Sequence, residues 1–553
     1  MTSGVSGGSP VSGRTAKRGD QTAVRGTLRS PASTPGWWKV AGAAALLALV
    51  IRLATLLMAH HLSGVFEYDD GVYFGSAVML ILGHLPYRDF VLIQPPGLTL
   101  LLTPFALLSR WTGTDRALEL ARLMVPLVAA CNVLLLARVL RHRSWLVLAS
   151  ACLLLAVYPD DILASTALLL EPFLIFFCLL ALVAAFDGDR LTSSAWRVFW
   201  AGAALGFGAD IKLWAAFPAV ILLLLCLPRP SRVAGLIGGA LVGALVPSLP
   251  FLVAAPAAFW HQVVVDQVGR AGVSALSPVI RLEFLTGVWP GLGVPAGHLY
   301  QLLAAVATGG IAVVVLTAFA TRLGRPRDTH GASSRGPSQL ELFAIGCTLL
   351  TAVALLVPAD FFYHYAAFLG PFLALLMGLA VGRLETVRPK PILGLVALIG
   401  AVGLIHALAI PLLVEKAPIT GAEIAALIPA GSCVVTDDPE YTLTANRYLA
   451  ASPGCPELVD GLGTTIAISG SQNPTSQRAQ RAGPAWLSYF RRAGYLVLTP
   501  LSGSRIPWDH ALEGYLETHF RLISKSPVVV LGRRSLPLRH KVPLPLPQLA
   551  GSG

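Results

Sequence analysis

Long apolar runs recur along most of this 553-residue sequence, and they constrain its fold more than any other feature. Many of them approach the roughly 20 residues that an α-helix needs to cross a bilayer. Charged residues make up 13% of the sequence, about half their usual share in a soluble protein. These features exclude a soluble globular enzyme and predict a polytopic α-helical membrane protein. The runs lie at residues 38–58, 90–109, 118–140, 145–158, 162–186, 195–209, 211–227, 233–255, 299–321, 341–357, 363–382 and 391–414.

The two ends of the sequence differ from this apolar middle. Residues 1–36 are rich in Ser, Gly, Thr, Pro and Arg, a composition that cannot bury a core and that predicts a disordered tail. Residues 415–535 return to mixed polarity with short β-like runs, which predicts a small α/β domain followed by a Pro-rich tail at 536–553. We therefore expect a transmembrane domain at 37–414 between two polar ends.

Basic loops between the apolar runs predict how the chain is oriented, because such loops stay in the cytoplasm. The four basic loops agree with one another if residues 59–117 form a single external loop. The run at 90–109 is then a re-entrant or juxtamembrane helix, broken by Pro95-Pro96-Gly97 and by Pro104. Eleven of the twelve runs cross the membrane, with a cytoplasmic N-terminus. The basic loops lie at 141–143, 229–232, 322–335 and 383–390.

This orientation places two further segments outside: residues 256–298, expected to include an amphipathic helix on the membrane surface, and the C-terminal domain. The net charge of +12 is then explained by basic loops that orient the chain and contact anionic lipid. No basic helix or finger motif indicates a nucleic-acid partner.

The predicted first external loop carries an acidic string, Glu67-Tyr68-Asp69-Asp70-Gly71, close to the end of the first span. Acidic residues there are costly if they enter the bilayer and tend to be functional. Adjacent carboxylates repel, so one can act as a base while the other binds or orients. A solvated loop with turn residues is the structural alternative.

The pattern Asp69-Asp70-Gly71-x-Tyr73 is followed by Gly83-x-x-Pro86-Tyr87-Arg88-Asp89 and Pro95-Pro96-Gly97. This succession resembles the first external loop of GT-C glycosyltransferases. The likeness is to the branch that holds protein O-mannosyltransferases and lipid A aminoarabinose transferases, which take a sugar from a polyprenyl-phosphate carrier at the external membrane face. Asp69 matches the catalytic aspartate of that family, and Asp70 stands where glutamate is commoner. The likeness covers roughly residues 38–414 in architecture, and matching at the level of motifs is confined to about residues 66–97 and scattered positions beyond.

The resemblance implies an inverting membrane glycosyltransferase of a bacterial plasma membrane, with Asp69 as general base and Asp70 beside it. The sugar is expected to be mannose or a pentose, and the acceptor is a glycan, a lipid or a protein. The leaving phosphate needs cations. The candidates are Arg88, Lys212 and Arg270 for the donor phosphate, and Glu171, Asp161, His364 and Tyr365 for the acceptor or a second acidic site.

Several of these residues also have structural interpretations. Asp160 or Asp161 can cap a helix. Lys212 can snorkel from a helix end to the interface or pair with Asp210. Tyr365 fits an aromatic interface belt.

A divalent metal, Mg²⁺ or Mn²⁺, could be held by Asp69 or Glu171, although the resembled branch includes members regarded as metal-independent. The absence of a Walker A sequence argues against ATP-driven transport. Cys433 and Cys455 are the two cysteines in polar sequence, and they can pair if that segment faces an oxidising compartment.

Two other functions fit a polytopic membrane chain. A flippase for lipid-linked sugars should show repeat symmetry and charges at mid-membrane, whereas the charges here gather at the external edge. A non-catalytic scaffold would bind glycan through residues 415–553 and would not depend on Asp69.

Overall fold

The structure is a computed structural model, and it describes residues 36–268, 276–286, 298–323, 336–357, 360–385, 389–456, 458–471, 473–474, 476–500 and 504–536. The predicted tails, apart from Gly36 and Leu536, and the candidate Arg270 lie outside these residues.

Six helices in the described part of the chain are long and apolar enough to cross a membrane, which makes this a multi-pass membrane protein. They are Trp37–Met58 (α1), Thr114–Leu140 (α4), Pro230–Ala254 (α10), Gln339–Leu356 (α15), Tyr363–Glu385 (η3 with α16) and Gly394–Leu413 within α17 (Pro389–Leu413). Four shorter apolar helices are Trp145–Val157 (α5), Leu170–Ala185 (α7), Leu213–Cys226 (η1 with α9) and Ala304–Phe319 within α14 (His298–Leu323). Ala195–Ile211 (α8) occupies a further predicted run. How many of these helices cross stays a prediction.

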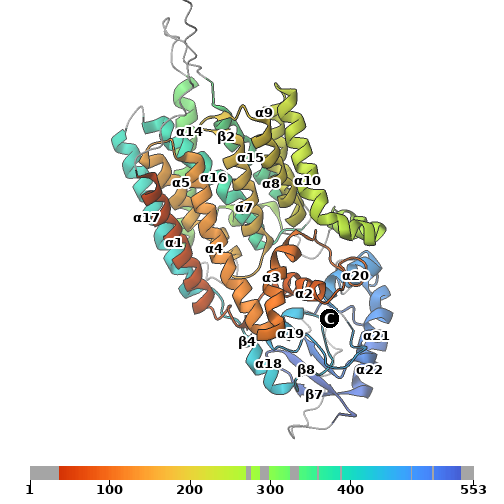
Figure 1. The fold of residues 1–553 in the computed structure, drawn as a ribbon. Helices are drawn as coiled ribbons and strands as arrows, with labels where there is room; N and C mark the ends of the chain where they lie inside the picture. The colour runs from red at the N-terminus through yellow and green to blue at the C-terminus, as the bar shows by residue number, and fades with distance from the viewer. Residues whose placement is uncertain are drawn as a thin grey trace, which may run out of the picture. The chain divides into compact units, whose positions relative to one another are not determined.

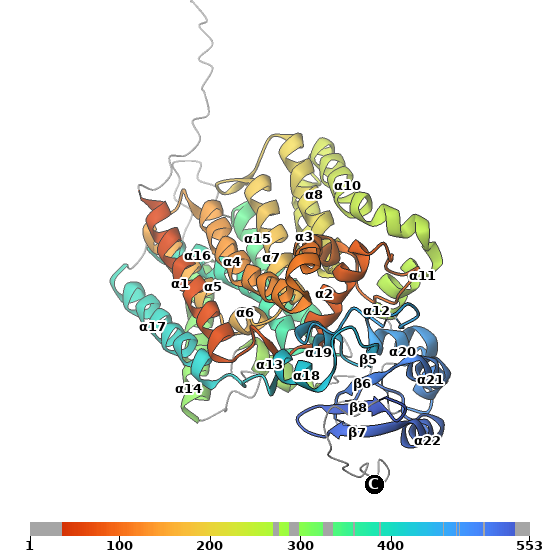
Figure 2. The same ribbon diagram turned by 60° about the horizontal axis from the view of Figure 1, so that its bottom comes forward.

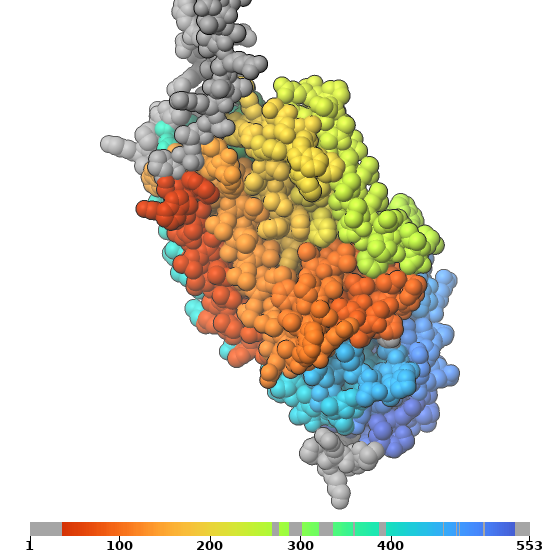
Figure 3. Space-filling view, viewed as in Figure 1, coloured from red at the N-terminus to blue at the C-terminus, as the bar shows by residue number. Residues whose placement is uncertain are grey.

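Small and branched apolar side chains hold the bundle together. Ala48 of α1, Leu136 of α4 and Leu155 of α5 belong to one buried cluster, and Figure 1 shows α1, α4, α5 and α16 side by side. The outer face of α10 instead exposes apolar residues such as Leu241 and Val253, and this helix lies within the yellow-green surface in Figure 3. An apolar face of this size suits lipid contact.

The first predicted loop contains two helices, Tyr68–Ile81 (α2) and Gly97–Thr112 (α3). They pack on one another, and α3 also contacts α4 and α8. Helix α3 begins directly after Pro96 and is not one of the apolar helices named above. That it is re-entrant or juxtamembrane stays a prediction. The prediction that Pro104 breaks this helix was wrong. A proline removes one backbone hydrogen bond, and the buried face formed by Leu98, Leu102 and Ala106 keeps the helix continuous.

The segment expected to hold one amphipathic helix contains several short ones where it is described. Pro256–Trp260 (α11) continues through a π-helical turn at His261–Val265 (η2) into Asp266–Val268 (α12), and Pro278–Leu285 (α13) follows separately. Proline at a first helical position starts a helix, and this is where Pro256 lies in α11 and Pro278 in α13.

The C-terminal segment, residues 415–536, contains a four-stranded sheet in the order β5-β6-β8-β7. The strands are Val434–Thr436 (β5), Tyr495–Leu498 (β6), Phe520–Ser524 (β7) and Val529–Arg533 (β8). The β5–β6 pair is parallel and the other two pairs are antiparallel. Trp486 and Phe490 pack against this sheet in a separate buried cluster. The helices are Gly421–Leu427 (α18), Pro439–Thr444 (α19), Gly461–Ser469 (α20), Ala479–Ala482 (η4), Gly483–Arg492 (α21) and His510–His519 (α22), with α21 and α22 beside the sheet in Figure 2.

Two short antiparallel pairs complete the sheet structure. Gly64–Val65 (β1) pairs with Ile419–Thr420 (β4), which ties the first loop to the C-terminal segment. Phe186–Asp187 (β2) pairs with Arg190–Leu191 (β3) in a hairpin after α7.

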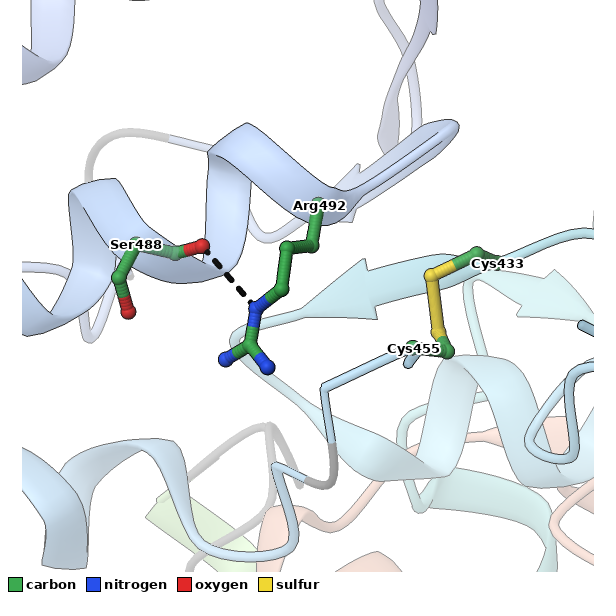
Figure 4. Close-up of a disulfide and its surroundings, with 4 residues drawn as sticks. All are labelled: Cys433, Cys455, Ser488 and Arg492. Carbon is green, nitrogen blue, oxygen red and sulfur yellow. Dashed lines mark hydrogen bonds between the residues drawn. A yellow bond between two sulfur atoms is a disulfide. The ribbon is translucent and has the colours of Figure 1, made fainter. Parts of the chain in front are cut away.

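A disulfide joins Cys433 and Cys455, whose Cα atoms are 5.5 Å apart. Figure 4 shows the bond together with α21, where Arg492 donates to the backbone oxygen of Ser488. The pairing that the sequence allowed is therefore present in the structure.

Candidate functional site

A buried cluster of charged side chains joins three helices of the bundle. Glu171 lies in the first turn of α7, Lys212 follows α8, and His364 lies in η3 (Tyr363–Leu369). Lys212 Nζ is 2.5 Å from Glu171 Oε1, and His364 Nδ1 is 2.9 Å from Glu171 Oε2. All three side chains are buried. The structure thus brings together three residues that the sequence named separately.

Aromatic rings surround the ammonium of Lys212. Its Nζ lies 3.8 Å from the ring centroid of Trp214 and 3.9 Å from that of Tyr365. Cation–π attraction strengthens when the cation is shielded from water, so both rings help to hold Lys212 inside the protein. The snorkelling interpretation of Lys212 was wrong, and so was its pairing with Asp210, which accepts a hydrogen bond from Ser248.

The helix η3 also reaches the acidic loop. The hydroxyl of Tyr363 donates to Glu67 Oε2 at 2.9 Å, and His364 beside it contacts Glu171. Burial and the neighbouring charge of Asp69 raise the pKa of Glu67 to about 7. Glu67, Asp69 and the Glu171 cluster therefore form one electrostatically connected site.

The two adjacent aspartates of the motif have different surroundings. Asp69 is partly exposed, and its Oδ2 accepts a hydrogen bond from the hydroxyl of Tyr73, one turn later in α2, at 3.2 Å. Asp70 is fully buried. It accepts from Arg122 Nε at 2.7 Å and from the backbone N–H of Leu168 at 3.2 Å. Asp69 therefore stays partly accessible, while Asp70 is fixed inside the protein.

Arg122 connects Asp70 to the C-terminal segment. Its guanidinium pairs with both Asp70 and Glu440 and donates to the backbone oxygens of Leu62 at 2.8 Å and Gly64 at 3.0 Å. Gly71 allows this approach, because a Cβ there would lie 2.3 Å from the backbone nitrogen of Glu440. The glycine of the motif is thus needed for contact with α19.

A second cation comes from the C-terminal segment. The guanidinium of Arg505 lies 3.9 Å from the ring centroid of Tyr68, and its Nη1 is 3.4 Å from Asp438 Oδ2. Its charge opposes the rise in the pKa of Glu67. Tyr68 in turn donates to Asp460 Oδ1 at 2.6 Å, so this segment contacts both the ring and the hydroxyl of the residue before Asp69.

Two candidates lie in other surroundings. Arg88 is 49% exposed and forms a bidentate pair with its neighbour Asp89, whose pKa that hydrogen bonding lowers to about 2. Asp161 pairs with Arg52 of α1 in a buried ion pair. The capping interpretation of Asp160 and Asp161 was wrong, because Tyr158 occupies the N-cap of Pro159–Ala164 (α6).

Sequence reasoning did not select Arg122, Glu440, Arg505 or Tyr363. Arg122 gave a detectable signal, since a charge inside a predicted span is costly and usually has a partner. Glu440 and Arg505 gave no local signal, because Arg122 and Tyr68, which they contact, lie hundreds of positions earlier. Among the described residues, no group of three or more His, Cys, Asp and Glu side chains is arranged to hold a metal ion.

The membrane bundle, the loop helices and the C-terminal segment define a polytopic membrane protein with the GT-C fold, as the motif predicted. This is the fold of ArnT from Cupriavidus metallidurans. The ArnT structure bound to undecaprenyl phosphate matches with a TM-score of 0.59 and 14% identity, covering 90% of this chain and 98% of that chain. Its apo structure matches with a TM-score of 0.59 and 15% identity, over 90% and 97%. Neither a protein-family model nor a curated protein sequence matches the chain.

Proposed function

We propose that this protein is an inverting glycosyltransferase that moves a sugar, mannose or a pentose, from a polyprenyl-phosphate carrier to an acceptor hydroxyl. The observation that carries the proposal is the position of Asp69, a partly exposed carboxylate connected through Glu67 and η3 to the buried Lys212. The polyprenyl-phosphate donor is favoured by the ArnT likeness, since that protein was solved with undecaprenyl phosphate.

In this reaction the acceptor hydroxyl attacks the anomeric carbon and loses its proton to Asp69, because a carboxylate within hydrogen-bond reach can act as general base. The sugar–phosphate bond breaks on the opposite face, and the carrier phosphate leaves with its electron pair. One displacement with one base inverts the anomeric centre.

Lys212 is the described cation that we assign to the leaving phosphate. Its ammonium is held in place by Glu171 and two aromatic rings, and a preorganised cation stabilises developing negative charge without reorganising. His364 Nδ1 lies 2.9 Å from the other oxygen of Glu171, so both carboxylate oxygens have a nitrogen beside them.

We place this site at the external face of a bacterial plasma membrane, with the N-terminus in the cytoplasm. The basic loops support this orientation. The Cys433–Cys455 disulfide supports it too, because disulfides persist in oxidising compartments.

The test uses purified protein in lipid vesicles with labelled polyprenyl-phosphate mannose, arabinose or glucose, and it measures which label leaves the carrier. Asp69→Asn should slow transfer about 100- to 10,000-fold, the usual contribution of a general base. Glu517→Gln, an exposed acid on α22, is the matched control and should retain full activity. Normal turnover by the Asp69→Asn protein would exclude Asp69 as the base.

A further inference from the structure

We propose that Glu440, in the C-terminal segment, is a positioning residue that fixes the acidic loop and so sets the place of Asp69. The contacts of Glu440 do not depend on the proposed function, whereas their consequence for catalysis rests on it. Glu440 is the second residue of α19 (Pro439–Thr444) and is fully buried.

Both oxygens of the Glu440 carboxylate are used. Oε2 accepts hydrogen bonds from the backbone N–H groups of Phe66, at 2.8 Å, and Glu67, at 2.9 Å. Oε1 pairs with Arg122. Because Arg122 also binds Asp70, one carboxylate holds the loop on both sides of Asp69.

The support for Glu440 is itself rigid. Asp438 caps α19, accepting from the backbone N–H of Glu440 at 3.0 Å, and Pro439 occupies the first helical position. Thr436, at the end of β5, donates to the backbone oxygen of Asp438 at 2.7 Å. The chain from the sheet to the Glu440 side chain is therefore fixed at each step.

Charge makes these contacts difficult to replace. A buried carboxylate without partners is strongly disfavoured, and charge-assisted hydrogen bonds are about twice as strong as neutral ones. Glutamine at position 440 would keep the shape and one carbonyl oxygen. Its NH2 group would face either Arg122 or the two backbone N–H groups. A donor would then meet a donor, so at least one set of contacts is lost.

A displaced loop should reduce the rate of the chemical step more than donor binding, because Lys212 lies on the bundle. Misplacing a reacting group by about 1 Å costs about 100-fold in rate. A residue needed only for folding would instead lower the amount of active protein and leave the turnover of that active fraction unchanged.

The test compares Glu440→Gln with Glu517→Gln in two measurements on the full-length protein. Hydrogen exchange should become about tenfold faster or more at the amides of Phe66 and Glu67, since they lose a charged acceptor, while β6 and β8 stay protected. In sugar transfer, kcat per active molecule should fall about 100-fold, with KM for the donor unchanged. The Glu517→Gln protein should match the wild type in both.

Unchanged exchange at Phe66 and Glu67 would overturn the proposal whatever the activity. Faster exchange with normal kcat would overturn the positioning role. If β6 and β8 also lose protection, Glu440→Asp, which keeps the charge on a shorter side chain, is measured in the same way and judged by the same outcomes. Absence of transfer by the wild type would count against the proposed function, and the exchange measurement would then decide alone whether Glu440 fixes the loop.

Discussion

Gly97 and Asp210 lie far apart in the sequence, yet their backbones touch: a Cβ on Gly97 would lie 2.6 Å from the backbone oxygen of Asp210. Gly97 ends the Pro95-Pro96-Gly97 motif and begins α3. Asp210 lies at the end of α8, two residues before Lys212. The motif therefore places the loop against the segment that carries the buried lysine.

Gly97→Ala should destabilise the protein by about 2 kcal/mol, the usual cost of overpacking, because the clashing atoms are backbone and cannot rotate away. Thermal unfolding in detergent measures the effect. Gly42→Ala on α1 is the control, since a Cβ there meets nothing within 4 Å. It should be neutral or stabilising, because alanine is the better helix former. Equal losses in the two variants would contradict the contact.

Lys212→Met should cost about 3 kcal/mol, because removing one partner leaves the buried carboxylate of Glu171 incompletely compensated. Adding Glu171→Gln to the same protein should recover most of that loss, since the uncompensated charge is then gone. The measurement is thermal unfolding of both variants beside Lys416→Met, which removes an exposed lysine. A double variant no more stable than Lys212→Met would argue against the ion pair.

The folded state should lose stability as the pH rises from 4.5 to about 7. The pKa of Glu67 is raised from 4.5 to about 7, so in this window the folded protein holds a proton that the unfolded chain has released. Stability then decreases with pH. Asp438, whose pKa burial raises to about 6, acts in the same direction. Glu67→Gln should make the slope of melting temperature against pH shallower, and an unchanged slope would show that Glu67 does not titrate there.

Sequence patterns predicted the helices because hydropathy is a local property. The family resemblance named Glu171, Lys212 and His364 one by one, but whether they contact one another depends on how three helices pack, which a local pattern does not record. Apart from the family resemblance, nothing in the sequence told Asp69 from Asp70, since they are adjacent and chemically identical. Arg122 and Glu440, both remote in sequence, decide which of them is buried.

Arg88 shows the opposite case. Its partner Asp89 is the next residue, so the competing ion pair was visible in the sequence. The structure gives that pair full bidentate geometry, with N–O distances of 2.9 and 2.8 Å. Only the family resemblance suggested that this guanidinium binds the donor phosphate. The carboxylate of the next residue was a stronger physical argument, because it can pair with the guanidinium directly.

The disulfide should stabilise the C-terminal segment. Replacing both cysteines, Cys433→Ser with Cys455→Ser, should cost about 3 kcal/mol for a loop of this length, measured by thermal unfolding. Reductant should lower the melting temperature of the wild type and leave that of the double variant unchanged. Cys131→Ser, which removes an exposed free thiol, is the control and should leave the wild-type response to reductant in place.

The same disulfide gives a test of orientation. In sealed right-side-out vesicles, a membrane-impermeant phosphine should reduce the Cys433–Cys455 bond, and an impermeant maleimide should then label both thiols if the C-terminal segment is external. Inverted vesicles should protect them. Arg141→Cys, in a basic loop that should face the cytoplasm, must show the reverse pattern and serves as the internal control. Labelling of Cys433 and Cys455 in inverted vesicles alone would reverse the proposed orientation and move the Asp69 site to the cytoplasmic face.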